Sequence, residues 1–199
     1  MISPLDSHNR RSIRLKAYDY SQSGAYFVTI CTHQRERLFG EVADGVMQLR
    51  VFGEIVQEEW LRTPQIRPEV EIDAFVIMPN HIHGIIVITG DGRTTSNLKT
   101  KPSNQSHPVG ANRRFAPTPT ASSQSNRPKG TKPGSLGAIL QQFKSVVTKR
   151  INLLRDTPGA SVWQRNYYES IIRDESTLNT VRLYIETNPT NWQTDPDNL

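Results

Sequence analysis

The chain has 199 residues, which suits a single domain with a hydrophobic core of its own. It holds 24 lysine and arginine residues against 19 aspartate and glutamate residues, and this net charge of +5 favours a polyanionic partner such as a nucleic acid. No apolar run approaches the roughly 18 residues that a membrane span needs, and the polar N-terminus has no signal-peptide core. The single cysteine, Cys31, can form no internal disulfide, and we expect a buried thiol in a cytoplasmic protein.

Hydrophobic periodicity in the first half of the chain predicts several strands and one amphipathic helix. β-Branched and aromatic residues mark the strands, and the turn dipeptide Asp44-Gly45 marks a short hairpin. The helix should stop before Pro64. In chain order, the predicted elements are a strand at 25–32, the hairpin at 38–49, a helix that carries Phe52, Ile55, Val56 and Trp60, and strands at 70–78 and 81–89.

Residues 91–134 differ in kind from the rest of the chain. They are mostly Ser, Thr, Asn, Pro, Gly, Lys and Arg, so they cannot bury enough apolar surface to offset the entropy lost on ordering. We interpret them as a flexible basic insertion within one domain that spans residues 1–199. The insertion either follows a phosphate backbone or is an inert solvated loop. The tail at 193–199 is predicted to be disordered.

The remaining part of the chain predicts two helices around one strand. An apolar stripe begins after Ser135, a strand is expected over 162–173, and Asp174 or Ser176 can cap a last helix that Pro189 ends. The order of elements is that of an α+β fold: a ferredoxin-like βαββαβ antiparallel sheet with helices on one face, plus an appended C-terminal helix. The stripe of the first of these helices consists of Leu136, Ile139, Leu140, Phe143, Val146, Val147 and Ile151.

His81 and His83 are the most informative residues of the chain. They follow the strand break Pro79-Asn80, and residues two apart on a strand project from the same face, while Ile82 points into the opposite layer. Two imidazoles held side by side can share one metal ion. Histidines on a surface or packed in a core are the commoner case, and we interpret His33 as such a surface residue.

Tyr184 and Asn188 are four residues apart on the last predicted helix, so they share a face with Cβ atoms roughly 6 Å apart. A tyrosine at such a position usually serves packing. Placed over the two imidazoles, however, the phenol becomes a candidate nucleophile, and His81, His83 and Asn188 would offer two nitrogens and one oxygen to a metal. That donor set, without thiolate, suits Mn²⁺ or Mg²⁺.

A rival pair of phenols, Tyr167 and Tyr168, lies on the strand predicted beside Trp163. This position suits packing, and no metal-ligand partner follows either residue at helical spacing.

Several segments together resemble the single-tyrosine HUH transposases (IS-two-hundred-like), and most of all the REP-associated tyrosine transposases. The resemblance implies a ferredoxin-like fold that cleaves and rejoins single-stranded DNA near hairpins. Carried over residue by residue, it makes His81 and His83 metal ligands, Tyr184 the nucleophile and Asn188 the third ligand. The segments are residues 11–20 (RSIRLKAYDY), AYFVTICTHQ, AFVIMPNHIHGII, LGAILQQFKS, VWQRNYYESIIRD and LYIETNP.

The reaction expected from this resemblance is a metal-assisted transesterification that forms a 5′-phosphotyrosine. Two other functions are possible: a non-catalytic regulator that binds DNA hairpins, and a phosphoesterase that uses activated water. The sequence leaves open whether the protein is a monomer or a homodimer, and whether Tyr184 acts in cis. Candidate phosphate contacts are Arg10, Arg11, Arg14, Lys16, Lys144, Lys149 and Arg150.

Overall fold

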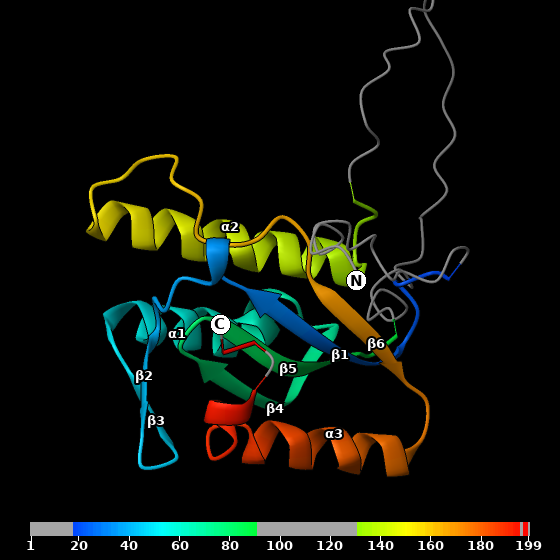
Figure 1. Ribbon diagram of the computed structural model, residues 1–199. Helices are drawn as coiled ribbons and strands as arrows, with labels where there is room; N and C mark the ends of the chain where they lie inside the picture. Colours follow the sequence, from blue (N-terminus) through cyan, green and yellow to red (C-terminus); the bar gives the residue numbers. More distant parts are fainter. Residues whose placement is uncertain (1–17, 91–130, 196, 199) are drawn as a thin grey trace, which may run out of the picture. The chain divides into compact units, whose positions relative to one another are not determined.

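Four antiparallel strands form the central sheet of the computed structural model, which describes residues 18–90, 131–195, 197 and 198 (Figure 1). The strands are β1 (Gly24–Cys31), β4 (Val70–Met78), β5 (His81–Ile88) and β6 (Tyr168–Ile172). They lie side by side in the order β4-β5-β1-β6. β5, which carries both histidines, is therefore an inner strand that is hydrogen-bonded on both sides.

Three α-helices and a small hairpin complete the described part of the chain. The succession strand, helix, strand, strand, helix, strand, helix is the predicted one, and the α+β fold class is confirmed. None of the helices in the described ranges is long and apolar enough to cross a membrane. The further elements are the 3₁₀ turn η1 (His33–Arg35), β2 (Gly40–Ala43), β3 (Val46–Leu49), α1 (Val51–Ile66), α2 (Leu136–Leu154), α3 (Glu175–Thr187) and the 3₁₀ turn η3 (Trp192–Thr194).

The two faces of the sheet are covered by different helices (Figure 1). α1 and α2 cover one face and enclose the larger core, to which β1 contributes Val28 and β5 contributes Ile82. α3 covers the opposite face, where Phe27 and Ile85 pack into a smaller core with Ile185 of the helix. Because side chains alternate along a strand, this division places the odd-numbered residues of β5 beneath α3.

Gly84 lets a helix approach the inner strand closely. A Cβ atom at this position would lie 2.5 Å from the ring of Trp60, a residue of α1 that is almost fully buried. The indole therefore occupies the space that a side chain at position 84 would need. This position directly follows His83 in the sequence. This contact fixes the position of α1 across the strand that carries the histidines.

Three boundaries sharpen or correct the prediction. α1 continues through Pro64 to Ile66, because proline removes only its own amide donor and the last turn still closes through the Arg67 amide, which donates to the Thr63 carbonyl at 2.9 Å. The expected strand at 162–173 joins the sheet only from Tyr168 onward. Asp174, rather than Ser176, caps α3, since its side chain accepts a hydrogen bond from the Thr177 amide at 2.8 Å.

The missing part of that strand has a physical reason. Trp163 is buried against Phe39 and Phe143, with ring centroids 5.2 Å and 5.9 Å away, and its backbone makes an isolated bridge to Thr32, the residue that follows β1. The apolar side chains at 162 and 163 are thus buried in the core between sheet and helices, although their backbone does not extend the strand.

We predict that Gly84→Ala destabilises the protein, because the new methyl group must displace the Trp60 ring in a close-packed core. The free energy of unfolding in urea should fall by about 1–3 kcal/mol. Gly90→Ala is the control: its Cβ meets only the Ser23 hydroxyl, at 3.1 Å. Equal stability of the two variants would contradict this account of the helix packing.

Candidate active site

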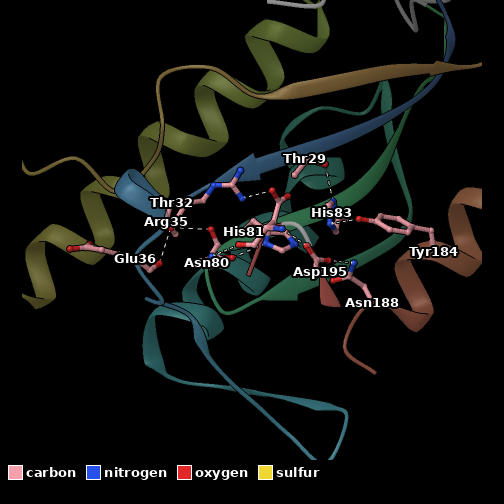
Figure 2. Close-up of polar contacts among 11 residues, drawn as sticks. Thr29, Thr32, Arg35, Glu36, Asn80, His81, His83, Tyr184, Asn188 and Asp195 are labelled. Carbon is pink, nitrogen blue, oxygen red and sulfur yellow. Dashed lines mark hydrogen bonds and ion pairs between the residues drawn. The ribbon is translucent and has the colours of Figure 1, made fainter. Parts of the chain in front are cut away.

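The two histidines of β5 lie side by side beneath α3. His81 and His83 are both almost fully buried, and their ring centroids are 4.4 Å apart. Figure 2 shows both imidazoles between the end of β1 and the C-terminal part of α3. The strand periodicity therefore brings the two rings to one place, as the sequence predicts.

Each histidine is held through its Nδ1 atom. The Nδ1 of His81 lies 2.8 Å from the Asn80 Oδ1, and the Nδ1 of His83 lies 2.8 Å from the Thr29 hydroxyl (Figure 2). The Asn80 amide group donates in turn to the carbonyl of Asp197 at 2.8 Å, which leaves its Oδ1 to accept from His81. With a proton on Nδ1, the Nε2 atom of His81 carries the lone pair that a metal requires.

Burial keeps both rings neutral. Desolvation lowers the pKa of His81 to about 4 and that of His83 to about 3, and the neighbouring imidazole contributes to the second shift. At neutral pH both rings are therefore uncharged. A neutral imidazole is the form that ligates a metal, so no proton has to be removed before a cation binds.

The phenol of Tyr184 reaches this pair from α3. Its hydroxyl lies 3.1 Å from the Nε2 of His83, and its ring meets Phe27 edge-on at 6.0 Å between centroids. Burial, followed by the charges of Asp195 and Asp197, raises the pKa of Tyr184 to about 12. The hydroxyl is therefore protonated at neutral pH, and a cation beside it would favour the phenolate needed for attack.

Asn188 follows Tyr184 by one helical turn and is buried beside the same site. Its amide nitrogen donates to Asp195 at 2.9 Å (Figure 2), whereas its Oδ1 is buried without a hydrogen-bond partner among the described residues. The Nε2 of His81 is unpartnered in the same sense. Buried polar atoms without partners are costly, and one imidazole nitrogen and one amide oxygen are donors that a divalent cation can use.

Two charged residues at the site, Asp197 and Arg35, are not among the residues predicted from the sequence. Asp197 forms a potential metal-binding group with the histidines, with one ligand atom from each lying within 4.8 Å of the others. Its carboxylate also pairs with Arg35 of η1 at 2.5 Å. Asp197 belongs to the tail predicted to be disordered, and no motif or spacing in the sequence distinguishes it from the other acidic residues of the chain.

An ion pair joins α3 to the edge strand β4 and fixes the position of the helix. β4 contains one extra residue relative to β5 between Ile72 and Phe75, and at this bulge Asp73 receives two hydrogen bonds from Arg182 of α3, at 2.8 Å and 2.5 Å. These bonds lower the pKa of Asp73, so the pair stays charged at neutral pH. Arg182 lies two residues before Tyr184, and the pair therefore holds the helix turn that carries the phenol.

The predicted phosphate contacts do not gather at this site. Lys144, Lys149 and Arg150 belong to α2, on the other face of the sheet from the histidines. Lys144 donates to two backbone carbonyls, of Gln164 and Arg165, and Arg150 pairs with Glu58 and Glu59 of α1. Arg10, Arg11, Arg14 and Lys16 lie outside the described residues, as do residues 91–130 of the predicted insertion.

The remaining sequence candidates occupy different surroundings. His33 is exposed, as expected. Tyr167 packs against the larger core, whereas Tyr168 is 46% exposed and lies on the side of Phe27, 6.3 Å away between ring centroids. The expectation that this pair serves packing therefore holds for Tyr167 and not for Tyr168.

A comparison with solved structures defines the fold. The chain resembles a REP-associated tyrosine transposase bound to a REP hairpin, with a TM-score of 0.54 and 17% identity over 90% of this chain and 73% of the other. The two proteins thus share a fold, and this is the fold that the resemblance found in the sequence implies. No protein-family model matches the chain.

A comparison of sequences defines the family. The chain is 40% identical over 188 residues to an uncharacterized protein of Haemophilus influenzae, a match that covers 94% of this chain and 92% of that protein. The chain belongs to the same family as this Haemophilus influenzae protein.

We predict that Asp73→Asn loosens α3 without disturbing the rest of the fold, because it removes the charge and one acceptor from the pair with Arg182. Hydrogen exchange followed by mass spectrometry should show several-fold faster amide exchange in α3 and no change in α2. Glu186→Gln, an exposed change on the same helix, should leave exchange in α3 as it is. Unaltered exchange in Asp73→Asn would show that the ion pair does not hold the helix.

Proposed function

We propose that the protein is a transposase that cleaves and rejoins single-stranded DNA near hairpins through a covalent intermediate on Tyr184. The observation that carries this proposal is the 3.1 Å contact between the Tyr184 hydroxyl and His83, beside a second buried imidazole. The transposase of similar fold is bound to a REP hairpin in its solved structure, which supports DNA hairpins as the partner of this chain.

A divalent cation is the cofactor we propose. His81, His83 and Asn188 would hold it, with Asp197 as a further oxygen donor, and these nitrogen and oxygen donors fit Mn²⁺ or Mg²⁺. When bound, the cation would polarise a phosphate oxygen and offset the negative charge that develops there. Asn80 and Thr29 orient the two imidazoles for this task.

Tyr184 supplies the chemistry that stores the bond. The phenol oxygen bonds to phosphorus as the bond from phosphorus to the 3′ oxygen breaks, and the proton that the phenol loses is balanced by the one that the 3′ oxygen gains. The products are a 3′-hydroxyl and a 5′-phosphotyrosine. The reverse attack by another 3′-hydroxyl rejoins the strand without an external energy source. Burial raises the pKa of Tyr184 above the usual value of about 10 for a phenol, so a cation beside the oxygen would have to stabilise the phenolate as it leaves in that second step.

We propose one phosphate contact at the site itself, beyond those predicted from the sequence. Arg35 is a partly buried cation whose partner, Asp197, also belongs to the histidine group. We propose that a phosphate oxygen of the DNA takes the place of this carboxylate on the Arg35 guanidinium, which can bind either group in the same geometry. Lys149, which is exposed on α2, would contact a more distant part of the DNA.

We predict a covalent protein–DNA species when the protein is incubated with labelled single-stranded hairpins from its own genomic neighbourhood and Mn²⁺ or Mg²⁺. The species should be visible on a denaturing gel and absent in Tyr184→Phe, because that variant lacks the attacking oxygen. Tyr167→Phe is the matched control, and it should form the species as the parent does.

The same gel distinguishes the other two functions. Cleaved DNA without a protein-linked product would indicate a phosphoesterase that uses water. Hairpin binding that survives in Tyr184→Phe, with no cleavage by the parent protein under any of these conditions, would indicate a non-catalytic regulator and overturn the proposal.

We also predict one tight Mn²⁺ site per chain, measured by titration with detection of free Mn²⁺ by electron paramagnetic resonance. His81→Ala should abolish this site, since it removes a ligand. Asn80→Ala should weaken the affinity about 10- to 100-fold, because the imidazole loses the partner that sets its tautomer. Mn²⁺ affinity that is the same in His81→Ala as in the parent protein would place the metal elsewhere.

A further inference from the structure

Tyr168 lies in the same row of the sheet as the candidate metal ligand. Thr29 of β1 pairs with His83 on one side and with Tyr168 on the other, and residues directly opposite each other in antiparallel strands project from the same face. Tyr168 is thus two strand spacings, about 10 Å, from His83 across the sheet. It stands beside the site on the edge strand β6.

The aromatic rings at this place form one continuous group around Phe27. The Phe27 ring stacks on His83 with centroids 5.5 Å apart, and it meets Tyr168 edge-on at 6.3 Å. The same ring also meets Tyr184 edge-on, at 6.0 Å between centroids. Phe27 therefore supports both phenols, one over the histidines and one toward the edge of the sheet.

The ring of Tyr168 is not needed to fill a core. Its neighbour Tyr167 packs into the larger core, while Ile172, farther along the strand on the α3 side, is buried with Leu178 and Val181 of α3. Tyr168 itself keeps 46% of its surface exposed, and Ser170 between it and Ile172 is exposed too. A large ring that contacts Phe27 and keeps nearly half of its surface exposed can receive a flat ligand.

We propose that Tyr168 is a stacking platform for a nucleobase of the single-stranded DNA next to the phosphate that Tyr184 attacks. The inference rests on the proposed function, which places that phosphate over His83. A single strand that crosses the sheet from β5 toward β6 brings its next bases above the Tyr168 ring. Stacking on an aromatic ring accepts any base, because every base has a π-face, so this site would hold the strand without reading its sequence.

The test measures binding apart from cleavage, in the Tyr184→Phe background and without metal. The probes are single-stranded hairpins from the genomic neighbourhood, each with one 5-iododeoxyuridine in the flank, for photocrosslinking, or one abasic nucleotide at the same position, for affinity. We expect one flank position to crosslink to Tyr168. Added to Tyr184→Phe, Tyr168→Ala should weaken binding about 5- to 150-fold, the range that one stacked base contributes. Tyr168→Phe in the same background should bind like Tyr184→Phe alone.

A double-mutant cycle makes the result specific. Removing the base at the crosslinked position should weaken binding to the protein that keeps Tyr168. It should have little further effect in Tyr168→Ala, because both changes remove the same contact. Leu153→Ala, at an exposed apolar residue of α2 on the other face of the sheet, is the control and should change nothing. Affinity of Tyr168→Ala within twofold of the parent, or additive losses in the cycle, would overturn the stacking site.

The outcome can be separated from that of the proposed function. If the covalent species on Tyr184 forms but the cycle is additive, only the stacking site fails. If stacking on Tyr168 is observed and the parent protein forms no covalent species, the chain binds single-stranded DNA there without cleaving it, and only the proposed reaction fails.

Discussion

The burial of two neutral imidazoles on one face of an inner strand is the constraint on which the site depends. β5 is hydrogen-bonded on both sides, which fixes the backbone of His81 and His83, and Tyr184 of α3 lies against His83. Burial disfavours the charged form of each ring and lowers the pKa of both histidines well below the usual value. What remains is a pair of lone-pair donors beside a phenol, a set of groups that could hold a cation.

The surrounding structure fixes this arrangement one contact at a time. Gly84 lets Trp60 lie against β5 from behind, Asn80 and Thr29 set the orientation of the rings, and the Asp73–Arg182 pair holds α3 in front. Three of these contacts join segments that are distant in the sequence. The fourth, between Asn80 and His81, fixes the orientation of the neighbouring imidazole. The site is therefore a product of the whole sheet and not of the histidine motif by itself.

The part of the site that follows local periodicity could be predicted from the sequence. A period of two places His81 with His83, and a spacing of four places Tyr184 with Asn188 on one helix face. Arg35 and Asp197 could not be found this way, because a turn and a tail meet only through the path of the folded chain. The same limit explains why β6 is shorter than predicted. Apolar residues such as Trp163 indicate burial, but they do not indicate whether their backbone pairs with a strand.

The central claim is that Tyr184 is the residue that becomes joined to DNA, and mass spectrometry of the trapped product tests it most directly. Digestion with trypsin after Arg182 releases a peptide that begins at Leu183 and contains the phenol in question. We expect the nucleotide remnant on this peptide, attached through its 5′-phosphate. A remnant on the peptide that contains Tyr167 and Tyr168, or recovery of the Leu183 peptide only in unmodified form from an active preparation, would contradict the account.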